Sequence, residues 1–252
     1  MSEAVSYQVA AGVATLTMDQ PDTRNSLTPE LVEGLAEGLR TAQADTAVRV
    51  VLLTNTGSAF CAGADLSGRS NPAVKQRVGV DEVLGAILES PKPVVGRVAG
   101  HCMGGGVGLA AACDLSVAHT GVRFGFTEVR LGVAPAIISV VCLPKLRRGD
   151  ALELYLTGER ISASRAAEVG LITSAVPEEA LDGTVADLVA KLTAGGPGAL
   201  AAAKQLVFDV PGTERAEAFA WMSEVSRSLF ASEEAAEGMA AFREKRPPSW
   251  VP

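Results

Sequence analysis

Two stretches of small residues could place bare backbone next to a ligand. Residues 60–66 read Phe-Cys-Ala-Gly-Ala-Asp-Leu, and residues 100–106 read Gly-His-Cys-Met-Gly-Gly-Gly. Each follows a predicted strand, and loops after parallel strands are where α/β proteins bind ligands. Unpaired N–H groups at a helix start can receive developing negative charge. The glycines at 104–106 would also permit tight helix–strand packing, so composition alone leaves both interpretations open.

The segments that must position these loops read as alternating strands and helices. Four strands are predicted from runs rich in Val, Leu and Thr, at Val13–Met18, Val48–Thr54, Pro93–Val98 and Leu115–Ala118. Between the first two, Thr28 is placed to cap a helix that begins at Pro29, in which leucines recur every four residues. A short helix of small residues is expected at 106–113. This order predicts a layered α/β domain whose apolar strands are parallel and buried.

The second half of the sequence is predicted to be helical. Strand signals stop after residue 177, and helices are expected at 181–192, 199–208, 215–230 and 233–242. The Gly195-Gly196-Pro197-Gly198 cluster interrupts this half. We therefore expect a core at residues 1–195 and a helical C-terminal region at residues 196–252. Such a region could pack on a partner subunit or on its own body.

Composition excludes several classes of protein. The 252 residues carry 22 Lys and Arg against 29 Asp and Glu, a net charge of −7. The basic residues are scattered, which argues against binding of nucleic acid or of an anionic membrane. No basic segment precedes an apolar one at the N-terminus, and the longest apolar stretch, 132–143, falls short of the roughly 20 residues of a membrane span. The sequence predicts a soluble, cytoplasmic protein.

The cysteines and histidines suggest neither disulfides nor a metal site. Four cysteines lack C-x-x-C spacing and lie in apolar or glycine-rich surroundings, at Cys61, Cys102, Cys113 and Cys142. They are expected to be reduced, half-buried thiols. With only two histidines, structural zinc is not expected.

One motif imitates a dinucleotide-binding fingerprint. Residues 106–111 fit G-x-G-x-x-A, and Glu128 lies at roughly the distance along the chain at which that motif has its ribose-binding acid. However, five residues separate Val98 from Gly104, and the helix must end by Cys113 because the next strand begins there. The crossover is too short for a Rossmann unit, so we reject this interpretation.

Several ordered motifs carry a family resemblance. They are the two loops at 60–66 and 100–106, Cys113-Asp114-Leu115, and the segments 124–132, 156–159, 166–171, 202–204 and 242–248. In this order and spacing they resemble the crotonase (enoyl-CoA hydratase/isomerase) superfamily over nearly the whole chain. The resemblance implies a spiral of ββα units and a C-terminal all-helical trimerisation region, in a trimer or a dimer of trimers. It also implies an acyl-CoA thioester substrate, with no cofactor beyond the CoA of that substrate.

The resemblance further implies an oxyanion hole of two backbone N–H groups. Carried onto this chain, the donors are Ala62, just before Gly63, and Gly105, in the middle of the triple glycine. Adding or removing a proton next to a thioester passes through an enolate, whose oxygen two preorganised donors would stabilise.

Only one of the two glutamates of family hydratases is present. The second is Glu128, whereas Gly108 stands at the position of the first. Hydration by two carboxylates therefore cannot be carried over unchanged. From the residues alone Glu128 could be a solvated carboxylate at a strand end; the aligned segment favours a catalytic acid or base.

Other residues are expected to contact the substrate by the same resemblance. Arg24 would lie along the CoA moiety, and Asp65 and Leu66 would border its adenine. The remaining expected substrate contacts are Ala62, Gly63, Ala64, Gly105 and Gly108. Lys245 and Arg246 could reach CoA phosphates from a neighbouring subunit, although exposed tail charges are the simpler interpretation. His101 is expected to make local hydrogen bonds rather than to act as a second catalytic group.

The leading functional hypothesis is a lyase that adds water to a 2-enoyl-CoA thioester. The segments 106–109 and 126–139 are similar to those of hydratases acting on methylglutaconyl-type acyl groups, so a branched or methylglutaconyl-type substrate is one candidate. Two alternatives remain: a Δ3,Δ2-enoyl-CoA isomerase that uses one glutamate, and a non-catalytic subunit that binds acyl-CoA. The sequence indicates neither the acyl chain length nor a counter-ion for a distal carboxylate.

Overall fold

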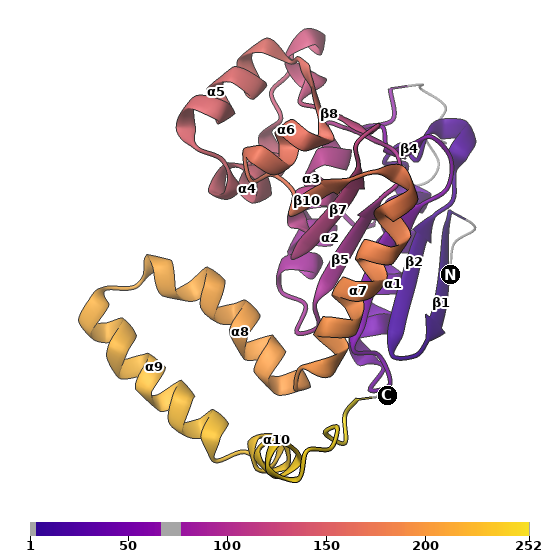
Figure 1. The fold of residues 1–252 in the computed structure, drawn as a ribbon. Coiled ribbons are helices and arrows are strands. Elements are labelled where there is room, and N and C mark those ends of the chain that lie inside the picture. Colours follow the sequence, from indigo (N-terminus) through magenta and orange to yellow (C-terminus); the bar gives the residue numbers. More distant parts are fainter. Residues whose placement is uncertain (1–3, 67–76, 252) are drawn as a thin grey trace.

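The computed structural model describes residues 4–66 and 77–251, and their strands form two sheets (Figure 1). The larger sheet has the order β1 (Val5–Ala10), β2 (Val13–Met18), β3 (Val50–Asn55), β5 (Val94–Val98), β7 (Leu115–His119) and β10 (Ser174–Val176). The smaller has the order β4 (Ala59–Cys61), β6 (His101–Met103), β8 (Arg123–Gly125) and β9 (Arg160–Ser162). From β2 to β10 the larger sheet is parallel, whereas β1 is antiparallel to β2. The predicted α/β class is confirmed.

The chain repeats one unit that places the two loops. A long strand enters the larger sheet, a short strand enters the smaller one, and a helix follows: β3, β4 and α2 (Val80–Leu88), then β5, β6 and α3 (Gly105–Ala112). The segments 60–66 and 100–106 overlap β4 and β6, which pair in parallel. The two small-residue loops therefore lie next to each other.

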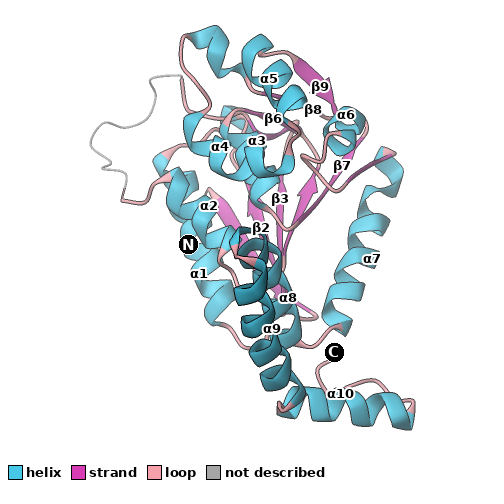
Figure 2. Ribbon diagram, turned by 90° about the vertical axis from the view of Figure 1, so that its left-hand side faces the viewer, coloured by secondary structure: helices cyan, strands magenta, loops and turns pink. Residues whose placement is uncertain are grey.

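Helices cover both faces of the larger sheet (Figure 2). On one face, Val51 and Leu53 of β3 join the core formed with α1 (Pro29–Ala44). On the other, Val50 packs with Leu181 and Val185 of α7 (Leu181–Ala194). Because neighbouring residues of a strand point to opposite faces, a strand covered on both faces must be apolar throughout. This explains the continuous apolar run that predicted β3.

The start of α1 agrees with the prediction. The Thr28 Oγ1 accepts a hydrogen bond from the Leu31 N–H at 3.3 Å, and Pro29 is the first helical residue. The side-chain oxygen thus satisfies one of the N–H groups that a helix leaves unpaired at its start.

A group of short helices follows β8 and stands above the ends of the strands. It comprises η2 (Thr127–Leu131), α4 (Ala136–Cys142), η3 (Leu143–Lys145), α5 (Arg148–Thr157) and α6 (Ala163–Glu168). α4 contacts α3, and α5 contacts η2. The remaining 3-10 turns are η1 (Pro21–Thr23), η4 (Glu178–Ala180) and η5 (Val210–Gly212).

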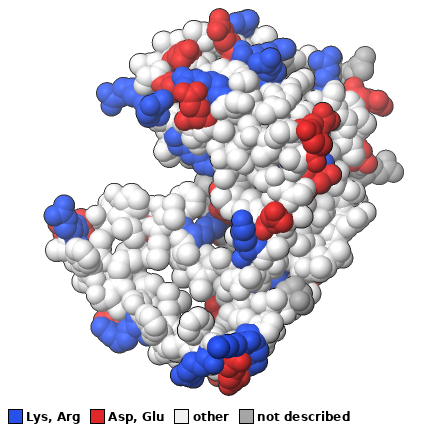
Figure 3. Space-filling view, in the orientation of Figure 1, with Lys and Arg blue, Asp and Glu red and all other residues white. Residues whose placement is uncertain are grey.

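The last three helices form an arm that extends from the sheets (Figures 1 and 2). They are α8 (Pro197–Asp209), α9 (Arg215–Phe230) and α10 (Glu233–Glu244), close to the predicted bounds. Neither α8 nor α9 has a buried residue. Most of the surface over this arm is uncharged in Figure 3.

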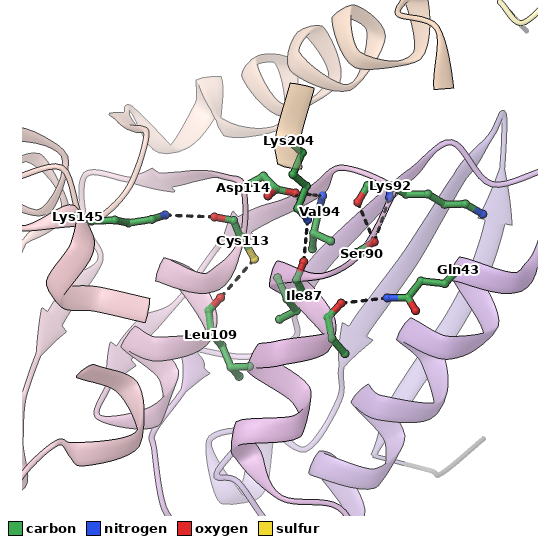
Figure 4. Close-up of polar contacts among 11 residues, drawn as sticks. Gln43, Ile87, Ser90, Lys92, Val94, Leu109, Cys113, Asp114, Lys145 and Lys204 are labelled. Carbon is green, nitrogen blue, oxygen red and sulfur yellow. Dashed lines mark hydrogen bonds and ion pairs between the residues drawn. The ribbon is translucent and has the colours of Figure 1, made fainter. Parts of the chain in front are cut away.

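Two basic residues tie the arm to the body. Lys204 of α8 reaches the core, where its Nζ donates to Asp114 Oδ2 at 2.9 Å and to the Ile87 carbonyl oxygen at 2.8 Å (Figure 4). At the other end, the Arg49 guanidinium donates to the carbonyl oxygens of Trp250 and Gly195, both at 2.7 Å. Each link joins residues far apart in the sequence.

The sequence missed one long strand and all the short ones. β1 is mostly exposed at the edge of its sheet, so it lacks a regular apolar pattern. The strands of the smaller sheet have three residues each, too few to show a period. The four cysteines are free, as predicted, but they are fully buried rather than half-buried.

Candidate active site

A cavity of about 340 Å³ lies between the two small-residue loops and the segment that joins η2 to α4. Its wall is almost entirely apolar. The lining residues are Leu27, Ala62, Gly63, Ala64, Leu66, Val80, Gly104, Gly105, Thr127, Glu128, Leu131, Val133, Ala134, Pro135, Ala136, Ile137 and Ile138. Glu128 is the one titratable side chain among these described lining residues.

Two glycines allow the loops to approach each other. Gly63 has φ +87°, and a Cβ on it would lie 2.8 Å from the Met103 carbonyl oxygen and 3.4 Å from the Gly105 nitrogen. Gly104 has φ +51°, and a Cβ there would lie 3.0 Å from Oε1 of Glu128. The left-handed backbone and the close contacts both require glycine at these positions. The glycines therefore bring backbone N–H groups and a carboxylate to one place.

The prediction that Ala62 supplies an oxyanion-hole donor is wrong. Its N–H already donates to the carbonyl oxygen of Arg24 at 3.0 Å, a contact that the left-handed backbone of Arg24 (φ 55°) presents. Within residues 4–66 and 77–251, the N–H groups of Ala64 and Gly105 donate to no acceptor. Gly105 is the first residue of α3, where helices leave N–H groups unpaired. Ala64 and Gly105 thus each present a free backbone donor at the cavity.

Glu128 lies on η2 with its carboxyl group directed at Gly104, in the loop 100–106. Oε1 is the atom nearest to the point where a Cβ on Gly104 would lie, and Oε2 is buried. Burial raises the pKa of this carboxyl group, and a hydrogen bond from its own backbone N–H partly offsets the effect. A carboxyl group with a raised pKa in an apolar cavity is suited to proton transfer near neutral pH.

Gly108 does not line the cavity, because Ile138 occupies the space in front of it. A Cβ on Gly108 would lie 2.9 Å from the Ile138 Cβ and closer still to its Cγ2. The Ile138 side chain, on α4, thus fills the space that a carboxylate side chain at residue 108 would need. The expectation that Gly108 contacts the substrate is wrong in that Ile138, not Gly108, lines the cavity.

The remaining predicted residues fall into two groups. Gly63, Ala64 and Leu66 line the cavity, and Leu66 is 71% exposed at its edge. Arg24 contributes its backbone to the loop, and its side chain is exposed, while Asp65 is not among the lining residues. The structure therefore brings three of these five to the cavity.

His101 and Arg246 do not line the cavity and make other contacts. The His101 Nδ1 accepts a hydrogen bond from the Arg123 N–H at 3.1 Å, as predicted. Arg246 pairs with Glu237 and Glu244 of its own chain, with the contact to Glu237 Oε1 at 2.7 Å. Both thus have partners within their own chain.

Residues 133–138 form one wall of the cavity. They belong to the segment 126–139, from which the sequence analysis derived a candidate acyl group. They also lie in the longest apolar stretch, 132–143, in which four large side chains are exposed: Val133, Ile137, Val140 and Leu143. Apolar side chains exposed on so short a segment are the signal that could have indicated a binding surface.

Residues 4–66 and 77–251 contain no group of three or more His, Cys, Asp or Glu side chains placed to hold a metal ion. No helix among the same residues has the length and hydrophobicity of a membrane span.

Comparison with known proteins identifies the family of this chain. The family model described as enoyl-CoA hydratase/isomerase matches residues 8–251. The chain is 43% identical to a crystal structure of an enoyl-CoA hydratase from Mycobacterium avium, covering 99% of this chain and 100% of that chain with a TM-score of 0.74.

Two further similar proteins indicate the same family. A crystal structure of the enoyl-CoA hydratase of Mycobacterium smegmatis is 32% identical, with 98% of both chains covered and a TM-score of 0.89. The 2,3-dehydroadipyl-CoA hydratase of Escherichia coli is 31% identical over 94% of both chains. These matches confirm the predicted crotonase-type fold: this chain belongs to the enoyl-CoA hydratase/isomerase family.

Proposed function

We propose that this protein is an enoyl-CoA hydratase with a single catalytic carboxylate, Glu128. The observation that carries the proposal is the position of that carboxyl group, which faces the same cavity as the free N–H groups of Ala64 and Gly105. A carboxylate and two donors are what proton transfer next to a thioester requires. The names of the relatives support the same reaction class.

In this proposal the thioester oxygen sits between the Ala64 and Gly105 N–H groups. Glu128 takes a proton from water, the water oxygen bonds to C3 of the 2-enoyl group, and electrons move to the thioester oxygen. The enolate then takes the same proton from Glu128 at C2. One carboxylate thus serves as base and then as acid, so the mechanism needs no carboxylate at Gly108.

We further propose an uncharged acyl group. The described lining residues include no Lys, Arg or His. An ionised carboxylate buried in such a cavity without a counter-ion would lose its hydration and gain nothing in return. An aliphatic group, straight or branched, fits this wall better than a methylglutaconyl-type group.

The contact between Gly108 and Ile138 favours a second candidate, a Δ3,Δ2-enoyl-CoA isomerase. Moving a double bond requires one base that removes a proton from C2 and returns it at C4. With Ile138 at the position of a second carboxylate, the site holds one such base. A non-catalytic subunit that binds acyl-CoA remains the alternative outside enzymes.

We also propose that the protein is a cytoplasmic homo-oligomer, a trimer or a dimer of trimers, associated through the arm. Phe219, Phe230 and Phe242 are 70%, 71% and 85% exposed on α9 and α10. Aromatic surface of this extent is typical of interfaces. A second copy of this chain is the partner proposed.

An assay with a panel of acyl-CoA thioesters tests the proposed function. The panel comprises 2-enoyl-CoAs with straight, branched and carboxyl-terminated acyl groups, and matched 3-enoyl-CoAs. We expect loss of the conjugated thioester absorbance with the uncharged 2-enoyl compounds. Gain of that absorbance from 3-enoyl compounds alone would identify an isomerase, and binding without turnover of any compound would refute an enzymatic function.

A further inference from the structure

Ile138 belongs to the buried part of the cavity wall. It is 4% exposed, lines the cavity and packs against the bare backbone of α3 at Gly108. The neighbouring wall residues Val133 and Ile137 are exposed, at 58% and 51%. Close-packed side chains have little freedom to move, whereas exposed ones change rotamer readily. The wall is therefore rigid at Ile138 and yields more easily at Val133 and Ile137.

The rigid part of the wall lies one helical turn from a free N–H donor. Gly105 is the first residue of α3, and Gly108 follows it at i+3. Residues at this spacing share one face of a helix, with about 5–6 Å between their Cβ positions. Within the part of the chain that the structure describes, the Gly105 N–H donates to no acceptor, and Gly105 lines the cavity. Ile138 thus stands close to the atoms that this donor would bind.

The position of that donor decides which part of the acyl group meets Ile138. In the proposed function the thioester oxygen accepts a hydrogen bond from Gly105, with an N···O distance of about 2.9 Å. The acyl carbons within one helical turn of the donor are then C2 and C3, because these directly follow the thioester carbon. A longer chain continues along the wall of residues 133–137. Ile138 therefore faces C3 and its substituents rather than the end of the chain.

We propose that Ile138 is a specificity-determining residue: it excludes acyl groups that carry a methyl group at C3 and admits those that carry hydrogen there. Behind Ile138 lies the backbone at Gly108, which has no side chain that could rotate aside. Adding a methyl group to a close-packed contact forces side chains out of their rotamers or shifts the backbone. The preferred substrates are then 2-enoyl groups unbranched at C3. The assignment of C3 rests on the proposed function, which places the thioester at Gly105.

The packing of α4 on α3 holds Ile138 in place and also supplies a control. The buried residues of α4 are Ile138, Val141 and Cys142. Ile138 and Val141 are three residues apart, so they lie on the same face of the helix. Val141 is buried but is not among the residues that line the cavity. Truncation of Val141 therefore loosens the packing of α4 without opening the cavity, which makes it the matched control for Ile138.

The first test is the binding of two isomeric saturated thioesters, pentanoyl-CoA and 3-methylbutanoyl-CoA. They have the same number of carbon atoms and differ only in the branch at C3, and neither can be hydrated. We expect wild type to bind 3-methylbutanoyl-CoA about tenfold more weakly in isothermal titration calorimetry, the usual scale for one methyl group in an apolar pocket. In Ile138→Ala the two Kd values should become nearly equal, while Val141→Ala should keep the ratio of wild type.

The second test compares turnover of 2-pentenoyl-CoA and 3-methyl-2-butenoyl-CoA. Since the intrinsic reactivity of each compound is the same for every variant, the preference in kcat/KM for the straight compound should fall about tenfold in Ile138→Ala and stay constant in Val141→Ala.

Equal affinity of wild type for the two saturated thioesters would overturn the proposal, even if Ile138→Ala does not fold. So would an unchanged ratio in a folded Ile138→Ala protein, or a ratio that relaxes equally in Val141→Ala. Failure to turn over any 2-enoyl-CoA would refute the proposed function, while the two Kd values would still test the space at C3.

Discussion

The Ile138 side chain fills the space that any side chain at Gly108 would need. The Ile138 Cβ would be 2.9 Å from a Cβ on residue 108, and both residues are buried where α3 meets α4. A carboxylate at residue 108 and an isoleucine at residue 138 exclude each other. The pair thus determines that the site has one carboxylate.

Substitution at this pair should show strong coupling. We expect Gly108→Glu to lower the free energy of unfolding by about 3 kcal/mol, because it overpacks the contact and buries a charge. Ile138→Ala in the same chain should recover part of the loss, with a coupling of roughly 0.5–3 kcal/mol. Urea denaturation measures both. The control is Gly183→Glu on α7, where a Cβ meets nothing within 4 Å.

A second prediction concerns turnover. Glu128→Gln should lower kcat by about 10²- to 10⁴-fold, the contribution of a positioned acid or base, while thioester binding persists. The matched control is Glu159→Gln, an exposed glutamate outside the acyl cavity. Wild-type turnover of the Glu128 variant on a confirmed substrate would contradict the assignment.

The raised pKa of Glu128 also predicts how stability depends on pH. Between the ordinary glutamate pKa and the raised one, the unfolded chain has lost its proton while the folded chain keeps it. The free energy of unfolding should therefore fall as pH rises through this window. Glu128→Gln lacks this loss, so the difference in stability between variant and wild type should move in the variant's favour from pH 4 to pH 7. Denaturation curves at both pH values measure it, and a pH-independent difference would show that burial does not shift this group.

Two proline variants separate the proposed oxyanion-hole donor, Ala64, from the structural N–H of Ala62. Ala64→Pro removes a free donor, so kcat should fall by about 10²- to 10³-fold with the fold retained. Ala62→Pro removes the N–H that donates to Arg24, so the main loss should be in stability, about 1 kcal/mol or more. Circular dichroism establishes folding before the kinetics. Normal turnover of a folded Ala64→Pro protein would remove Ala64 from the mechanism.

The last prediction addresses association. Light scattering at micromolar concentration should give the mass of a trimer or hexamer, and Phe230→Asp on α9 should lower that mass by burying a charge in the interface. Leu66→Asp, which changes another exposed apolar residue away from the arm, should leave the mass unchanged. A monomeric wild type would contradict the proposed interface.

What the sequence could predict depended on local interactions. The cap of Thr28 on α1, the continuous apolar run of β3 and the glycines of the two loops each act within a few residues, and all three lie as expected. The donor at Ala62 was wrongly assigned because a hydrogen bond to Arg24, distant in the sequence, decides which N–H is free. Ile138 in front of Gly108 likewise depends on how α4 packs on α3, which no local pattern specifies.

The two hydrogen bonds of Arg49 turn the C-terminal arm into a closed loop. They bring Gly195, where the arm begins, next to Trp250, where it ends. A chain held at both ends has fewer conformations than a tail held at one, and the entropy of that closure grows only slowly with loop length. In the proposed oligomer, Arg49 would therefore remove in advance part of the conformational entropy that α8, α9 and α10 lose on association. A single guanidinium directly before β3 thus closes the loop that carries all three helices of the arm.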